Sequence, residues 1–261
     1  MSSLRIGCVK YLNARPLIRG CPGGIEFDHP SVLCERLAKG ELDIALVSSF
    51  EFLRNPIYRI VDEVSISSDG PVYSVVVAHR GDISEIKEIE LDPASQTAVN
   101  LLRCLHAEVG CNPRLVRRNT GVSPAGAKSI SARRAQLLIG DQAIRFRESH
   151  AGEFRFWDLG EQWKKLIGLP FVYALWLIRP EVPDAKTIAS RLRTLRDENL
   201  ADLDRLIAAE TDFDRQFCAC YYREHLRFNF GEQEKEGLRT FAKLCAKHGL
   251  LEESDLRFDL V

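Results

Sequence analysis

The sequence has 261 residues, of which 45% are hydrophobic and 28% are charged, so it can form the core of one large domain or of two smaller ones. Its formal net charge of −1 provides no overall attraction to nucleic acid or to anionic membranes, and we expect neither as a partner. An anionic ligand would therefore be held by local donors such as backbone amides and hydroxyl groups.

The first half of the chain alternates short apolar runs with helical patterns. We predict, in order, a strand over 4–9, a polar loop over 11–17, a strand over 24–27, a helix opened by Pro30-Ser31 and ending at 39, a strand over 43–47, a short helix over 50–54 and a β-rich run over 72–78. Ser31 is expected to cap the first helix, and Gly40 follows its end. The segment 58–68 is expected to cross toward the β-rich run.

The second half repeats this layout in pattern, with negligible sequence identity to the first. We predict a strand over 86–91, a polar loop over 92–97, a helix from 98 to 105, a strand over 114–116, a helix over 124–133, a strand over 136–139, a helix over 143–148 and an apolar strand over 171–178. From Ala185 onward the pattern is helical, and these helices are expected to cover the first lobe.

Strands that alternate with helices predict an α/β protein with parallel sheets, in which ligands bind outside the carboxyl ends of the strands. Two such units joined by two strand-like crossings indicate a hinged clamshell. We place lobe 1, with the C-terminal helices, at residues 1–82 and 176–261, lobe 2 at 83–175, and the substrate crevice between them. The alternative is one continuous doubly wound sheet.

The eight cysteines show no C-x-x-C spacing and no nearby histidine doublet, so we predict no metal site. The N-terminal residues run directly into the first strand without the pattern of a signal peptide. No apolar run approaches the roughly 18 residues that span a bilayer. We therefore expect a reduced, cytoplasmic protein.

The usual catalytic signatures do not occur. The sequence has no P-loop, nucleophile elbow or H-E-x-x-H motif, and its six histidines are scattered, which argues against a Ser-His-Asp triad. What remains is a set of polar residues at the predicted strand ends: Asn13, Ser48, Ser49, Ser74, Ser95, Thr97 and Asp141.

Several of these residues have an alternative, purely structural role. Ser48-Ser49, Ser95 with Thr97, and Asp141 each precede or open a helix and could simply cap it. Capping and ligand binding are compatible, because a helix start can hold a carboxylate with hydroxyl and N–H groups together. Asn13 within an apolar loop and Ser74 within an apolar strand are more informative, since buried polar groups require partners.

Segments containing these residues resemble, in order and at matching spacing, the motifs of the chorismate dehydratases of menaquinone biosynthesis. They are 11–17 (YLNARPL), 40–48 (GELDIALVS), 70–75 (GPVYSV), 138–141 (LIGD), and 158–163 (DLGEQW) with 168–176 (GLPFVYALW). The likeness continues through the C-terminal helices, at Tyr222 and at 230–232 (FGE), so it covers essentially the whole chain.

The resemblance implies a type II periplasmic-binding-protein fold that serves as a cytoplasmic enzyme. It would act in the futalosine pathway, converting chorismate to 3-[(1-carboxyvinyl)oxy]benzoate and water without a cofactor or metal. The family motifs assign Asn13 and Ser74 to catalysis, and Ser95 and Thr97 to the substrate's carboxylate. The other expected substrate-binding residues are Ser48, Ser49, Gln96 and Asp141.

This chain departs from the family at a few positions. The family often has Arg and Ser where Gln96 and Ala98 stand, in the loop expected to hold the anion, and Thr where Ile167 stands. Because no side chain stands out as a strong base, we expect a carboxylate of the substrate to take the proton. Asn13 and Ser74 are expected to hydrogen-bond the departing hydroxyl or the developing ring charge.

Two other functions suit the same fold. A non-enzymatic solute-binding protein would ordinarily carry a signal peptide or lipobox. A later futalosine-pathway enzyme of this fold acts on a cyclised, nucleoside-derived intermediate, and the segments 70–74 and 138–141 favour the dehydratase instead. The oligomeric state stays open, as does whether Asp141 contacts the substrate or only braces the second lobe.

Overall fold

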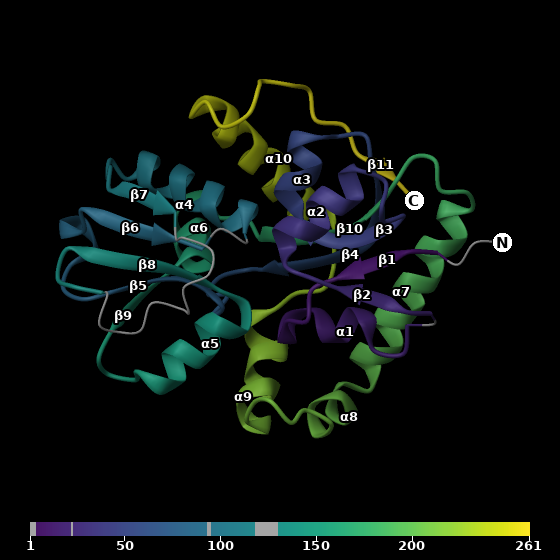
Figure 1. Ribbon diagram of the computed structural model, residues 1–261, viewed down its shortest axis with the longest axis horizontal. Coiled ribbons are helices and arrows are strands. Elements are labelled where there is room, and N and C mark those ends of the chain that lie inside the picture. The colour runs from purple at the N-terminus through teal and green to yellow at the C-terminus, as the bar shows by residue number, and fades with distance from the viewer. Residues whose placement is uncertain (1–3, 22, 93–94, 118–129) are drawn as a thin grey trace.

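The computed structural model describes residues 4–21, 23–92, 95–117 and 130–261, which form two α/β units lying side by side (Figure 1). Within these residues, one unit is built on a six-stranded sheet and the other on a five-stranded sheet. The predicted two-lobed α/β fold is confirmed, and the alternative of one continuous sheet is wrong.

The first sheet has the strand order β11-β4-β10-β3-β1-β2. Its strands are β1 (Ile6–Cys8), β2 (Ile25–Phe27), β3 (Ile44–Ser48), β4 (Arg59–Ser68), β10 (Phe171–Ile178) and β11 (Asp259–Leu260). β1 pairs in parallel with β2 and β3, whereas β10 runs antiparallel between β3 and β4. The helices of this unit are α1 (Arg15–Ile18), α2 (Pro30–Ala38), α3 (Ser49–Arg54), α7 (Ala185–Ala201) and α10 (Glu232–Lys247).

The second sheet has the strand order β7-β6-β8-β5-β9. Its strands are β5 (Val75–His79), β6 (Glu88–Leu91), β7 (Arg114–Arg117), β8 (Arg134–Ile139) and β9 (Arg155–Asp158). β6 pairs in parallel with β7 and β8, and β5 runs antiparallel between β8 and β9. The helices of this unit are α4 (Gln96–Glu108), α5 (Gly140–Ser149) and α6 (Leu159–Ile167).

The chain crosses between the sheets twice, from β4 to β5 and from α6 to β10. By strand pairing, β5 belongs with the second sheet and β10 with the first. The lobe limits at 82/83 and 175/176 stay a prediction. The C-terminal part is helical, as predicted: α7 packs on β4 and α10 on β10, while the shorter α8 (Leu203–Ala208) and α9 (Arg215–Cys220) follow α7.

Several predicted element starts are wrong; α5, for example, begins at Gly140 and not at 143. α2 begins at Pro30, so Ser31 lies inside its first turn and is not its cap. Proline fits this position because the first N–H groups of a helix have no acceptor within the helix. The β-rich run predicted from 72 becomes a strand only at Val75, because Tyr73 has a φ of +67° and interrupts the extended backbone.

The segment 155–167 contains a strand and a helix, β9 and α6, that were not predicted. Asp158 caps α6 by accepting from the N–H groups of Gly160 and Glu161, and Gly168 ends it with a φ of +80°. The helix predicted over 124–133 lies outside the described residues up to 129, and residues 130–133 are not helical.

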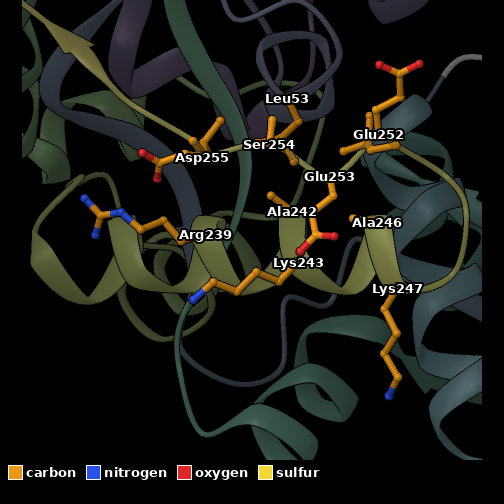
Figure 2. Close-up of a pocket in the computed structure, with 12 residues that line it drawn as sticks. Leu53, Arg239, Ala242, Lys243, Ala246, Lys247, Glu252, Glu253, Ser254 and Asp255 are labelled. Carbon is orange, nitrogen blue, oxygen red and sulfur yellow. The ribbon is translucent and has the colours of Figure 1, made fainter.

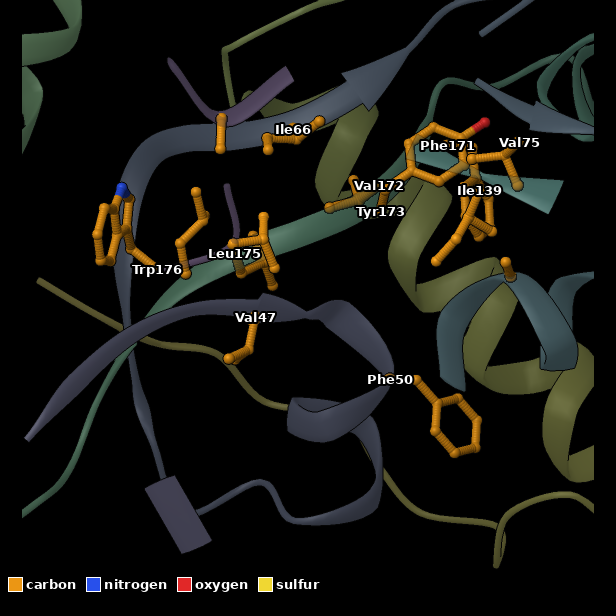
Figure 3. Close-up of a cluster of buried hydrophobic side chains, with 14 of the residues drawn as sticks. Val47, Phe50, Ile66, Val75, Ile139, Phe171, Val172, Tyr173, Leu175 and Trp176 are labelled. Atoms are coloured by element: carbon orange, nitrogen blue, oxygen red, sulfur yellow. The ribbon is translucent and has the colours of Figure 1, made fainter. Parts of the chain in front are cut away.

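One apolar core extends through both units. It joins β3 and β10 of the first sheet to β5 and β8 of the second, as Figure 3 shows for Val47, Leu175, Val75 and Ile139. Every residue of β3 is buried, which matches an apolar run covered on both faces of a sheet. Within the described residues, no helix is both long enough and apolar enough to cross a lipid bilayer.

Candidate functional site

A cavity of about 70 Å³ lies between the two sheets, and we call it the crevice cavity. Its wall takes residues from β3, β4 and β10 of the first sheet and from β5 and β8 of the second. The described wall residues include no charged side chain. Those that carry a polar side chain are Tyr11, Asn13, Ser48, Ser95, Thr97 and Tyr173.

Asn13 lies in a 3-10 turn, Leu12–Ala14, that follows β1. The turn is held at Leu12 from two sides, because its N–H donates to Asp141 Oδ1 at 2.8 Å and its carbonyl accepts from the Tyr222 hydroxyl at 3.0 Å. The buried Asn13 Oδ1 atom has no hydrogen-bond partner among the described residues. A fixed, unsatisfied acceptor at a cavity wall is suited to receive a hydrogen bond from a ligand.

Ser74 lies just before β5 and is fully buried, next to the wall residue Val75. The Tyr221 hydroxyl donates to Ser74 Oγ at 2.6 Å, which leaves the serine proton available for another acceptor. Burial raises the pKa of Tyr221 well above its ordinary value, so the phenol stays protonated and remains a donor. Ser74 itself is not among the described wall residues of the crevice cavity, so the structure places it next to a wall residue along the chain but not in the wall.

The backbone that leads into Ser74 has an unusual conformation. Tyr73 has a φ of +67°, in the left-handed region that a bulky residue rarely adopts. Asp158 accepts from the N–H groups of Val72 and Tyr73 at 3.0 and 2.8 Å. Arg147 donates to the Tyr73 carbonyl at 3.0 Å and lies over the Tyr73 ring. Together these contacts fix the point at which the chain enters the second sheet.

Ser48, Ser49 and Thr97 form a cluster of buried hydroxyl groups, which we call the hydroxyl latch, where α3 and α4 begin. Thr97 Oγ1 hydrogen-bonds Ser48 Oγ, lies 3.3 Å from Ser49 Oγ and accepts from the Phe50 N–H at 3.2 Å. Ser48 Oγ also accepts from the Thr97 N–H at 3.2 Å. Ser49 Oγ donates to the Val172 carbonyl at 2.7 Å. The latch thus joins the two lobes, and each of its hydroxyl groups has a protein partner.

Ser95 and Gln96 differ although they are neighbours at the start of α4. Ser95 Oγ accepts from the Ala98 N–H at 3.1 Å, so Ser95 caps the helix while it also lines the crevice cavity. The Gln96 carbonyl accepts from Asn100 Nδ2 at 3.0 Å, and Gln96 is not among the described wall residues. The structure therefore brings Ser95 to the cavity and leaves Gln96 beside it.

Asp141, in the first turn of α5, reaches from the second lobe to the Leu12 N–H of the first. It is not among the described wall residues of the crevice cavity. Burial raises the pKa of its carboxyl group, and the Leu12 N–H partly opposes that rise. In this structure Asp141 braces the turn that carries Asn13.

Sequence reasoning missed three tyrosines: Tyr11 and Tyr173, which line the crevice cavity, and Tyr221, which contacts Ser74. The Tyr11 ring lies so close to Gly140 that a Cβ added there would come within 2.8 Å of it, and Gly140 has a φ of +55°. The Tyr173 hydroxyl lies 3.2 Å from Ser68 Oγ, and Tyr221 holds Ser74. The sequence signal that could have revealed them is a tyrosine among apolar residues, since a buried tyrosine hydroxyl needs a hydrogen-bond partner.

Other parts of the described chain offer less. No group of three or more His, Cys, Asp or Glu side chains among the described residues is placed to hold a metal ion. A hollow of about 400 Å³ lies between α10 and the segment 251–256 (Figure 2). Its charged lining residues are Arg239, Lys243, Lys247, Glu252, Glu253 and Asp255. None of its described lining residues has a buried polar atom without a partner, in contrast to Asn13.

Known proteins resemble this chain over most of its length. A profile of the family described as menaquinone biosynthesis matches residues 4–247. A chorismate dehydratase of Thermus thermophilus is 31% identical over 258 residues, which cover 91% of this chain and 93% of the relative. A chorismate dehydratase of Campylobacter jejuni is 24% identical over 237 residues, which cover 90% of each chain.

The solved structures show the fold. A Candida albicans protein described as having the generic periplasmic-binding-protein fold matches with a TM-score of 0.61 at 14% identity, and the match covers 98% of this chain and 92% of that one. This likeness agrees with the two sheets and the two crossings seen here.

Proposed function

This chain belongs to the menaquinone-biosynthesis family, and we propose that its crevice converts chorismate to 3-[(1-carboxyvinyl)oxy]benzoate and water. The reaction would make the protein a carbon–oxygen lyase of the hydro-lyase type. The observation that ties this chemistry to the crevice cavity is the buried Asn13 Oδ1 atom at its wall, which has no hydrogen-bond partner among the described residues.

The reaction removes the ring hydroxyl of chorismate and the hydrogen on the neighbouring ether-bearing carbon. The C–H electron pair becomes the third ring double bond as the C–O bond breaks, so the product is aromatic. A carboxylate of the substrate takes the ring proton, which leaves with the hydroxyl as water. Aromatisation drives the elimination, and the task of the protein is to hold the reacting groups in the orientation for elimination rather than for rearrangement of the side chain.

Asn13 and Ser74 act on the leaving group in this proposal. Asn13 Oδ1 accepts a hydrogen bond from the departing hydroxyl and orients it. The Ser74 oxygen already accepts from Tyr221, so its own proton is directed to the oxygen that leaves. Donors that are fixed before the reaction stabilise developing charge without reorganising.

The hydroxyl latch and Ser95 would hold the substrate's carboxylates. Ser48, Ser49, Ser95 and Thr97 place hydroxyl groups at the starts of α3 and α4, with Gln96 beside them. A cavity of about 70 Å³ is well below the several hundred Å³ typical of ligand pockets, so the lobes must part to admit chorismate. Opening of the two lobes would separate Thr97 from Ser48 and Ser49, and the hydroxyl groups could then bind a carboxylate of the substrate.

We also propose a cytoplasmic location. Five cysteines are both free and fully buried: Cys8, Cys34, Cys104, Cys218 and Cys245. Free thiols in this number suit a reducing compartment, where disulfides are rare. Fractionation of cells that produce the protein would test this point, and recovery in the periplasmic fraction would refute it.

The test of function is direct. Purified protein is incubated with chorismate in the presence of a chelator, and the benzoate product is followed by mass spectrometry beside an Asn13→Ala control. We expect product from the wild type at a rate far above that without protein. Tight binding of chorismate without turnover would favour a solute-binding protein. Turnover only of the cyclised, nucleoside-derived intermediate would favour the later pathway enzyme, and loss of chorismate at the uncatalysed rate would refute the proposal.

A further inference from the structure

One turn in the C-terminal region contacts both segments that carry the proposed catalytic residues. α9 continues directly into a π-helical turn, Tyr221–His225, in which the Leu226 N–H donates to the Tyr221 carbonyl at 3.2 Å. π-helical turns are rare and occur frequently at functional sites. This turn is far in sequence from Asn13 and Ser74, and the tertiary fold brings it to them.

The first two residues of the turn are buried tyrosines with different partners. Neighbouring residues of a helical turn point in different directions, so Tyr221 and Tyr222 can reach two separate segments. The Tyr221 hydroxyl donates to Ser74 Oγ at 2.6 Å. The Tyr222 hydroxyl donates to the Leu12 carbonyl at 3.0 Å, one residue before Asn13. Burial raises the pKa of both phenols, so both remain neutral donors.

The turn is itself firmly held on the Ser74 side. The Tyr221 ring stacks on Phe217 with centroids 5.5 Å apart and an interplanar angle of 16°. His225 Nδ1 lies 2.9 Å from the Pro71 carbonyl, in the crossing that leads to Ser74. An element anchored in this way can impose a position on the side chains that it contacts.

The Leu12 side is anchored independently. The Tyr222 hydroxyl also lies 3.4 Å from Glu210 Oε1, and Glu210 pairs with Arg15, two residues after Asn13. Leu12 is thus held by Tyr222 from the C-terminal region and by Asp141 from the second lobe. The Asn13 side chain is then carried on a backbone that has little freedom to turn.

We propose that Tyr221 and Tyr222 are positioning residues that fix Ser74 and Asn13 relative to each other for the dehydration, an inference that rests on the function proposed above. Tyr221 occupies an acceptor site of Ser74 and so directs the serine proton toward the substrate. Tyr222 pins Leu12 and thereby holds Asn13 Oδ1 at the cavity wall. Because both tyrosines lie on one turn, the spacing of the two groups is set by that turn as well as by the closure of the lobes.

The experiment compares Tyr221→Phe and Tyr222→Phe, alone and combined with Ser74→Ala or Asn13→Ala. The matched control is Tyr58→Phe, because Tyr58 is equally buried and its hydroxyl bonds Glu51 and Asn55 away from the cavity. We expect each crevice variant to lower kcat by about tenfold with KM little changed, as the loss of one oriented hydrogen bond implies. Tyr58→Phe should lose stability without a change in kcat.

The double variants separate positioning from general stability. If Tyr221 acts through Ser74, Tyr221→Phe causes no further loss of kcat in the Ser74→Ala protein, and Tyr222→Phe behaves likewise with Asn13→Ala. Three outcomes would overturn the proposal. The losses of kcat could multiply in the double variants, the single variants could keep the wild-type kcat, or the loss of kcat could simply follow the fall in melting temperature.

A binding measurement keeps this inference separate from the proposed function. An inactive wild type would overturn the dehydration itself. In that case, or where the kcat of a single variant falls below detection, the same variants are compared by their calorimetric affinity for 3-(carboxymethoxy)-4-hydroxybenzoate. This probe keeps a hydroxyl group at the ring position of the one that leaves. If the loss of affinity in each double variant is no larger than in the Ser74→Ala or Asn13→Ala protein alone, the positioning role is supported. If the losses multiply, or if the tyrosine variants bind as the wild type does, the positioning role is overturned.

Discussion

Two polar groups of the site differ in their partners: in the hydroxyl latch, Thr97 hydrogen-bonds Ser48 and Ser49 across the lobes, whereas Asn13 Oδ1 has no partner among the described residues. A latch hydroxyl must give up a protein partner to bind substrate, so its net gain is small. Asn13 gives up none, and an unsatisfied buried acceptor is costly until a ligand satisfies it. The latch is therefore suited to entry and ground-state binding, and Asn13 to the reaction.

The largest effect should come from Asn13→Ala, which removes the unsatisfied acceptor. We expect kcat to fall by about 10²–10³, the loss seen when one oriented group is removed from an active site. The free energy of unfolding should stay the same or rise slightly, because no hydrogen bond within the described residues is lost. Steady-state kinetics and urea denaturation measure the two quantities. Asn55→Ala is the control, and an unchanged kcat for Asn13→Ala would remove the functional difference between Asn13 and the latch.

Thr97→Val, in the hydroxyl latch, should change KM and stability and leave kcat almost unchanged, in contrast to Asn13→Ala. Valine keeps the shape but removes the oxygen that contacts Ser48, Ser49 and the Phe50 N–H. We expect KM to rise by about tenfold and the free energy of unfolding to fall by about 1–3 kcal/mol, with kcat little changed. Thr187→Val, at an exposed position of α7, is the control. A large fall in kcat would show that the latch takes part in the reaction itself.

A smaller effect should separate capping from substrate binding at Ser95. Ser95→Ala loses the cap of α4, at a cost of about 1 kcal/mol of stability. Ser95→Asp keeps a good cap but places a negative charge at the cavity wall. We expect Ser95→Asp to retain stability at neutral pH and yet to raise KM more than Ser95→Ala. Equal KM values for the two variants would indicate that Ser95 is only a cap.

The smallest effect concerns Asp141, which braces the turn that carries Asn13. Its pKa is raised mainly by burial, so between the pKa of the unfolded chain and that of the folded chain the folded state binds more protons. The free energy of unfolding of the wild type should therefore fall as pH rises through that window. Asp141→Asn does not titrate and can still accept from the Leu12 N–H, so its stability should lack this fall. Parallel pH profiles of the two proteins would contradict this account.

Much of the fold was predictable from local patterns. Most of the predicted strands and helices occur, because apolar periodicity and capping residues act over a few positions. The exceptions have local causes: a positive φ at Tyr73 shortens a strand, and a proline at the start of α2 displaces the expected cap. β9 and α6, which meet at Asp158, were missed. Asp158 accepts four backbone hydrogen bonds, two from residues 72–73 and two from the start of α6, and no short sequence pattern reveals such a connection.

The candidate site was predictable in its residue types but not in its contacts. The order of polar residues at strand ends, and the family resemblance that they carry, follow from the sequence alone. The hydrogen-bond partners of these residues do not follow from the sequence, because they lie far apart along the chain. Thr97 is 49 residues from Ser48, Asp141 is 129 from Leu12, and Tyr221 is 147 from Ser74. Such pairs depend on how the lobes and the C-terminal helices pack, and packing is a property of the whole chain. The tertiary structure therefore determines that the latch hydroxyls are satisfied, whereas the Asn13 acceptor has no partner within the described residues.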